Sequence, residues 1–471
     1  MHKMMILPLL MLVFAAAVAG GEKEKPLPKG LPPYGPLKPF VAPQVTVEKL
    51  PNGLTLWLVP RAGFPKVAVT LAVRGGYSAD PKDLPGVSDL ILATIDQGTK
   101  TRDAKRIAQD LQAAGGDLSG ASGSDSLVLS TQVLADKLDS GVDVVADVVQ
   151  NATFPDDEVA LAKRNQADAL RAQEADPGFL ARRAVAKAMF GSHPYSVISA
   201  TQDSIAKTTA ATLRSEYARR FRPDQTALVV VGDFDAARFR AEADQLFGKW
   251  TNPAGPPAEA AAALSAPNPH EIFLVARPDS VQTTLEIQSF GPTRHGSDYS
   301  AAEVANALYG GMFGSRLINN IREDKGYTYS PGSGLQARRA IGVLSTRADV
   351  RNAVTGASLN EISYELNRMA TTAPTDDELA RAQRFLVGLQ AIRLQSAASV
   401  AGQLANLWIQ GLPPETLGEE AARIPKVTVA DVEAVGRKYF PFSRQTIVVV
   451  GIEKEIREQF APFGLEVKAA L

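Results

Sequence analysis

The stretch DDEVALAKR at residues 156–164 returns as DDELARAQR at residues 376–384, 220 positions later. Each copy begins with three acidic residues, which the helix macrodipole favours in the first turn. Pro155 suits the first turn of the earlier helix, and Thr375 with Glu378 predicts a capping box on the later one. The two stretches therefore predict two equivalent helices.

A second pair of stretches repeats at the same offset. QTALVVVG begins at Gln225 and QTIVVVG begins at Gln445, and runs of β-branched residues like these are typical of buried strands. Two matches at one offset indicate a duplicated unit that mixes strands and helices. We therefore expect an α+β fold of two similar domains, each an antiparallel-rich sheet with helices on one face.

The composition between the repeats predicts where the domains lie. Residues 251–271 are rich in Pro, Gly and Ala and are interpreted as a linker. The predicted domains are then residues 46–250 and 272–471, each of a common domain size. The first domain opens with a predicted hairpin at Pro51-Asn52-Gly53.

The N-terminus predicts export. Residues 1–19 combine Lys3, an apolar stretch and a small-x-small end, which is the pattern of a cleaved signal peptide. Residues 20–45 contain seven prolines and are interpreted as a stiff tether. A periplasmic or secreted protein is expected, with no membrane span once the signal is removed.

Charge and composition exclude several classes of function. The 471 residues carry 50 Lys and Arg against 51 Asp and Glu, so the basic excess of a nucleic-acid-binding protein is missing. The chain has no cysteine, which excludes thiolate zinc, iron–sulfur clusters and a cysteine nucleophile. Its four histidines have no metal-ligand spacing relative to one another.

Five motifs, in this order, carry a family resemblance. They are GYSADP at 76–81, GVSDLILATIDQGT at 86–99, GGDLSGAS at 115–122, HPY at 193–195 and GGMFGSRLINNIREDKGYTYSPGSG at 310–334. With the duplication and the size, they resemble the pitrilysin or insulinase-like (M16) metallopeptidases. The resemblance implies two homologous M16-like domains that hold a peptide between them.

The resemblance also identifies what has been lost. Active members carry His-x-x-Glu-His, whose histidines bind zinc and whose glutamate activates water. Here Asp89 stands at the first histidine, Leu92 at the glutamate and Ala93 at the second histidine, while Ala162 takes the place of the distal glutamate. We therefore expect no metal and no catalytic residue of this chain's own, and we interpret Asp89 as a helix-surface carboxylate.

The second half keeps two residues that the family presents to bound peptide, Arg322 and Tyr329. A guanidinium and a phenol can hold a carbonyl or stabilise an oxyanion. The alternative is an ion pair of Arg322 with Glu323 and a core position for Tyr329. The glycine-rich loop is formed by Gly310, Gly311 and Gly314, and packing or lining of the substrate chamber explains it equally well.

The stretch 115–122 resembles the edge strand on which the family docks substrate peptides. Ser119, Gly120 and Ala121 are small enough to let a peptide add to the sheet as an extra strand. In a chain without zinc, this edge strand either binds a peptide without cutting it or has only a structural role in the fold.

These observations lead to three hypotheses. In the first, the chain is the non-catalytic subunit of a heterodimeric M16 zinc peptidase, inactive alone, which closes the chamber and supplies Arg322 and Tyr329, while a partner homologue carries zinc. In the second, it is a zinc-free peptide-binding or structural envelope protein. The third and weakest is an active peptidase with relocated ligands.

Overall fold

The computed structural model describes residues 41–257, 261, 262, 264 and 269–470. The predicted signal peptide, most of the tether and part of the linker lie outside this range. The two repeated helices begin where the sequence predicts, as α4 (Asp156–Glu174) and α12 (Asp376–Arg393), and Thr375 and Glu378 form the capping box. Pro155 is the N-cap residue of α4 and not its first helical residue.

The first half builds a six-stranded sheet in the order β1-β2-β6-β3-β5-β4, in which β2 and β6 are parallel and the other neighbours antiparallel. The predicted hairpin is the β1–β2 pair, with Thr46 opposite Leu58. Strand β4 lies at one edge of the sheet. The strands are β1 (Thr46–Lys49), β2 (Thr55–Pro60), β3 (Lys66–Arg74), β4 (Leu118–Ser122), β5 (Ser126–Leu134) and β6 (Thr226–Gly232).

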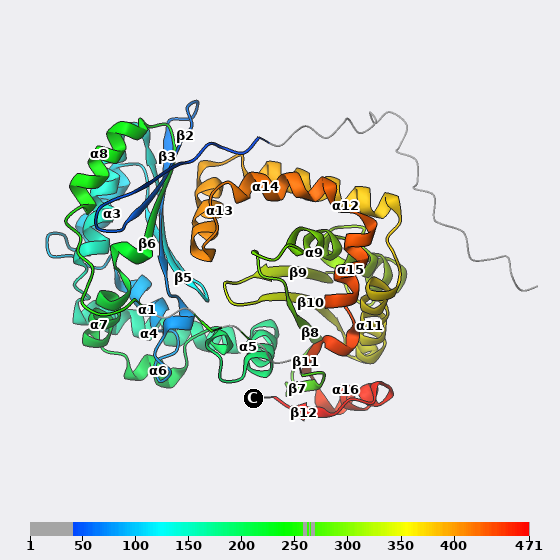
Figure 1. Cartoon of the computed structure of the whole chain (residues 1–471). Helices are drawn as coiled ribbons and strands as arrows, with labels where there is room; N and C mark the ends of the chain where they lie inside the picture. The colour runs from blue at the N-terminus through cyan, green and yellow to red at the C-terminus, as the bar shows by residue number, and fades with distance from the viewer. Residues whose placement is uncertain (1–40, 258–260, 263, 265–268, 471) are drawn as a thin grey trace, which may run out of the picture. The chain divides into compact units, whose positions relative to one another are not determined.

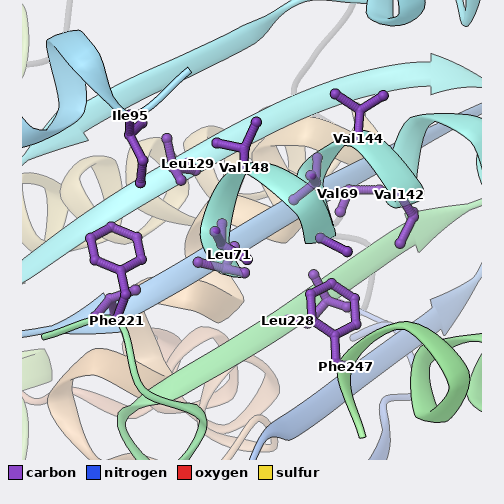
Figure 2. Packing of buried hydrophobic residues seen from close by; sticks show 14 of the residues in the cluster. Val69, Leu71, Ile95, Leu129, Val142, Val144, Val148, Phe221, Leu228 and Phe247 are labelled. Atoms are coloured by element: carbon purple, nitrogen blue, oxygen red, sulfur yellow. The ribbon is translucent and has the colours of Figure 1, made fainter. Parts of the chain in front are cut away.

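Helices of the first half cover one face of this sheet, with α3 and α8 visible on that side (Figure 1). The helices are α1 (Val87–Thr94), α2 (Ala104–Ala113), α3 (Leu138–Asn151), α4, α5 (Pro177–Phe190), α6 (Gln202–Lys207), α7 (Ala210–Arg220) and α8 (Ala236–Phe247). Figure 2 shows the core between these layers, where Val69 and Leu71 of β3 lie among Val142, Val148 and Phe221. Alternate β3 residues point into this core because side chains alternate along a strand.

The second half repeats the architecture. Its sheet has the order β12-β7-β11-β8-β10-β9, so β9 is the edge strand equivalent to β4. The strands are β7 (Ile272–Ala276), β8 (Gln282–Gly291), β9 (Gly332–Ala337), β10 (Gly342–Arg351), β11 (Thr446–Gly451) and β12 (Val467–Ala469). The helices are α9 (Tyr299–Asn306), α10 (Arg316–Ile318), α11 (Thr355–Thr371), α12, α13 (Ala397–Gln410), α14 (Thr416–Arg423), α15 (Val429–Tyr439) and α16 (Glu453–Ile456). The expected duplicated α+β fold is confirmed.

One helix of each half crosses to the other. Helix α5 packs on β11, β8 and β7 of the second sheet, and α13 packs on β3 and β6 of the first. The two helices begin 220 residues apart, at Pro177 and Ala397, so the exchange is reciprocal. The sequence predicts helices on one face of each sheet, and the structure adds a helix from the opposite half on the other face.

Candidate functional site

A pocket of about 340 Å³ lies between α1 and the edge strand β4. It brings together the degenerate zinc motif, represented by Asp89, Leu92 and Ala93, and the predicted docking strand, represented by Gly120. The helix begins after Gly86, whose φ is +81° and whose added Cβ would lie 2.4 Å from Ala200. Only glycine fits there, and this fixes how α1 enters the site.

Asp89 sits in a polar cluster and not on an open helix surface, so our interpretation of it as a surface carboxylate is wrong. Its Oδ1 accepts hydrogen bonds from the hydroxyl of Tyr77, at 2.8 Å, and from the hydroxyl of Ser122. Ser122 Oγ also lies 3.0 Å from Tyr77 Oη. The fold therefore turns this carboxylate toward β4 and holds it there.

Burial changes the acid–base chemistry of this cluster. Desolvation raises the pKa of the Asp89 carboxyl, opposed by the hydrogen bonds from Ser122, Tyr77 and Gln166. The pKa of the Tyr77 phenol is also raised, first by burial and then by the neighbouring Asp89 charge. No cation is among the groups that shift either pKa.

Helix α4 contributes Gln166 to the cluster and not Ala162. Gln166 Nε2 lies 3.5 Å from Asp89 Oδ2, and the Oε1 atom of Gln166 is buried without a hydrogen-bond partner. Ala162, one turn earlier, packs against the first core. The position that the family resemblance aligned with the distal glutamate therefore has a packing role.

The donor set does not fit a catalytic zinc ion, which needs three protein ligands and a water. Leu92, Ala93 and Ala162 have no donor atoms, and Oδ1 of Asp89 is already occupied by two hydroxyls. Across the part of the chain that the structure describes, no three His, Asp or Glu side chains are grouped to hold a metal.

In the second half, Arg322 and Tyr329 meet. The Arg322 guanidinium lies 4.6 Å from the centre of the Tyr329 ring and 5.0 Å from that of Phe313, so it makes cation–π contacts with two aromatic rings. It also pairs with Glu323 at 3.2 Å. Tyr329 is 78% exposed and Phe313 73%, which makes the alternative of a core Tyr329 wrong.

Gly310 and Gly311 lie in a π-helical turn, Ala307–Gly311, so the prediction of a loop holds only for Gly314, and the three glycines have different roles. Gly310 is buried, and an added Cβ would lie 2.8 Å from Ser333 Oγ, so it permits packing against β9. An added Cβ on Gly311 would lie 2.8 Å from the Asn306 amide. Gly314 has φ +82° and open space around it, so it provides the left-handed turn before Arg316.

The structure thus assembles two groups: Asp89, Leu92, Ala93 and Gly120 around the pocket, and Arg322 with Tyr329 in the other half. Ser119 and Ala121, the neighbours of Gly120 on β4, are exposed. Among the described residues, no hydrogen bond or ion pair joins the two groups. Sequence reasoning missed Tyr77, Ser122, Gln166 and Phe313, although all of them except Gln166 lie within the motifs quoted for the family resemblance.

Two α+β halves that exchange a helix, with a helix and an edge strand bounding a pocket, define a peptidase-type architecture whose metal positions have lost their ligands. Residues 60–200 match the model of the insulinase family, peptidase family M16, and residues 207–386 match the model of the peptidase M16 inactive domain. The chain belongs to the M16-like family.

Individual relatives agree with this assignment. An uncharacterized zinc protease of Mycobacterium tuberculosis is 26% identical over 413 residues, covering 86% of this chain and 93% of the relative. The uncharacterized zinc protease YmxG of Bacillus subtilis is 23% identical, covering 83% and 94%.

Solved structures share the fold. A peptidase M16 inactive domain from Pseudomonas fluorescens has a TM-score of 0.81 at 27% identity, covering 87% of this chain and 98% of that one. A protease from Helicobacter pylori has a TM-score of 0.82 at 18% identity, covering 87% and 100%. Within the described residues, no helix is both long and apolar enough to cross a bilayer.

Proposed function

We propose that this chain is the non-catalytic subunit of a heterodimeric M16 zinc peptidase. It binds the peptide, closes the substrate chamber and presents Arg322 and Tyr329, while a homologous partner supplies the metal. The proposal rests on one contrast between the halves. The zinc-motif positions offer a single carboxylate and aliphatic side chains, while the partly exposed Arg322 guanidinium lies over the ring of the exposed Tyr329.

The chemistry of the Arg322–Tyr329 pair supports this role. Cation–π contacts with Phe313 and Tyr329 restrict the guanidinium before any ligand arrives, which reduces the entropy lost on binding. A pre-organised guanidinium and phenol stabilise the oxyanion of a hydrolysed amide, or hold the carbonyl that precedes it. A pair that stabilises this oxyanion acts together with a metal centre, which the partner chain would supply.

The edge strand β4 supports the peptide-binding part of the role. Ser119, Gly120 and Ala121 are exposed, and β4 has a sheet neighbour, β5, on one side only. A peptide can therefore add as a further strand through its backbone amides and carbonyls. The export signal in residues 1–19 and the tether that follows support work outside the cytoplasm, in the periplasm or beyond.

A zinc-free binding or structural protein of the envelope is the second candidate. The same β4 edge favours it, because strand addition needs no metal. The two candidates differ in the partner. The first requires a zinc-bearing M16 homologue, whereas the second is supported by co-purification with an unrelated assembly.

The test measures peptide hydrolysis by the purified chain alone, by a zinc-bearing M16 homologue from the same organism alone, and by both together. We expect peptide hydrolysis only in the mixture, or a rate in the mixture at least tenfold higher than that of either chain alone. Chelator-sensitive turnover by this chain alone would contradict the proposal and favour an active enzyme with relocated ligands.

Two variants in the mixture test the Arg322–Tyr329 pair. Arg322→Ala is expected to lower kcat by about 10²-fold, the usual effect of losing one oxyanion donor. Tyr329→Phe is expected to lower it less. Exposed residues on nearby helices provide matched controls, Arg381→Ala and Tyr364→Phe. Equal rates for Arg322→Ala and Arg381→Ala would remove the assigned role.

A further inference from the structure

The pocket between α1 and β4 is lined by two carboxylates and by no cation. Its lining residues are Asp89, Leu92, Ala93, Ile95, Asp96, Gln97, Leu118, Gly120, Ser122 and Leu129. Burial raises the pKa of both carboxyls, and the groups that oppose this shift are hydroxyls, amides and backbone, with no Lys, Arg or His. A carboxylate in such surroundings gains from a positive charge brought to it.

Hydrogen-bond acceptors outnumber donors at the inner end of the pocket. Asp89 Oδ1 accepts from two hydroxyls, but Oδ2 has only the 3.5 Å contact from Gln166 among the described residues. In the same part of the chain, the Oε1 atom of Gln166 has no hydrogen-bond partner. A ligand group with several N–H donors would satisfy the free position of Asp89 better than a single hydroxyl would. A carbonyl cannot donate a hydrogen bond to it.

Four of the lining residues are aliphatic. Leu92 and Ile95 come from the α1 side, and Leu118 and Leu129 come from β4 and β5. Polar groups contribute the larger share of the lining, so aliphatic side chains and carboxylates lie next to each other in this pocket. This combination suits an amphipathic side chain with an aliphatic stem and a cationic head, as in lysine and arginine.

The sheet edge supplies the direction from which such a side chain would enter. Leu118, Gly120 and Ser122 are alternate residues of β4, so they share one face of the sheet, and all three line the pocket. A peptide that paired with the free edge of β4 would point alternate side chains toward the same face. Gly120 keeps this approach open, because an added Cβ would lie 3.2 Å from Leu92 Cβ.

We infer that this pocket binds the lysine or arginine side chain of an extended peptide paired with β4. The positions that bind a zinc cation in active relatives have become a receptor for the cation of a side chain, with Asp89 as the specificity residue. The inference rests on the peptide docking of the proposed function and adds the class of peptide that is bound.

The experiment measures binding of two fluorescent, end-capped octapeptides to the full chain by anisotropy. The peptides are identical except for lysine or norleucine at one central position, so they differ in charge at nearly equal stem length. We expect the lysine peptide to bind at least tenfold more tightly. Asp89→Asn should abolish this preference, and the exposed Asp83→Asn should retain it.

A second variant tests the pocket even if Asp89→Asn fails to fold. Ala93 is exposed on α1 and lines the pocket, so Ala93→Arg places a cation at the site without disturbing the core. It should also abolish the preference for lysine while the melting temperature stays near that of the wild type.

The outcomes separate this inference from the proposed function. Equal binding of both peptides by the wild type would overturn the inference and leave the docking on β4 intact. A lysine preference that survives in both Asp89→Asn and Ala93→Arg would overturn the role of the pocket. Binding of neither peptide would contradict the docking itself, and both proposals with it.

Discussion

Helices α5 and α13 each pack on the sheet of the opposite half, but the side chains at the two junctions differ. Helix α13 meets the first sheet through a largely apolar layer, in which Leu404 and Leu407 lie among Trp57, Val229 and Val231. At the position of Leu404, helix α5 has Ala184, 220 residues earlier. At this position α13 therefore buries a larger apolar side chain than α5 does.

The sheets differ in the same way. Thr70 is registered against Val229 in the first sheet, whereas Glu286 is registered against Val448 in the second. Glu286 is only 3% exposed, and burial raises its pKa, opposed by Gln288 and the Arg347 and Arg182 charges. A cavity of about 400 Å³ also lies beside α5, lined in part by Arg182, Gln288 and Arg338.

This difference shows that a duplicated topology does not imply duplicated energetics. One junction packs Leu404 on a largely apolar sheet face, and the other has Ala184 at the equivalent position and adds a buried carboxylate and a cavity. We expect the α13 junction to contribute more to the stability of the chain and the α5 junction to respond more to pH.

The largest expected effect comes from removing the α13 anchor. Leu404→Ala deletes a side chain that is 0% exposed, so we expect it to lower the free energy of unfolding by about 2–5 kcal/mol. The measurement is a denaturant titration. Ala184→Gly at the equivalent position of α5 should cost only about 1 kcal/mol, the helix-propensity difference. Equal losses at the two positions would remove the distinction between the junctions.

An intermediate effect is expected at the rim of the α13 junction. The Arg74 guanidinium lies 4.2 Å from the centre of the Trp408 ring and donates a hydrogen bond to the Trp408 carbonyl at 2.7 Å. Burial, with Arg339 nearby, lowers its pKa to about 10, so it remains charged at neutral pH. Arg74→Met should destabilise by about 1–2 kcal/mol. Arg74→Lys keeps the charge and should recover only part of the loss in thermal unfolding.

The smallest effect is the pH dependence of the α5 junction. Because the folded pKa of Glu286 is raised, its contribution to stability is complete below the unfolded pKa near 4.5 and is lost as pH rises through the folded pKa. Glu286→Gln should therefore stabilise the chain at pH 8 and have little effect at pH 4. Melting temperatures across this range test it, and a larger gain at pH 4 would reverse the sign.

Local patterns predicted much of the fold correctly. The acidic first turns predicted where α4 and α12 begin, and the β-branched runs predicted β6 and β11, because caps and strand preferences act over a few residues. The exchange of α5 and α13 was not predictable in this way. An apolar helix face shows that a partner surface exists, but not which sheet provides it.

The candidate site also has features that the sequence alone predicts and features that depend on tertiary contacts. The sequence by itself determined the duplication, the family resemblance and the loss of zinc ligands at Leu92, Ala93 and Ala162, because donor atoms are a property of residue type. Only the tertiary structure decided that Asp89 turns into a pocket beneath β4, that Gln166 reaches it from α4, and that Arg322 stacks on Tyr329. Such meetings depend on burial and on contacts between distant segments, which no short stretch of sequence specifies.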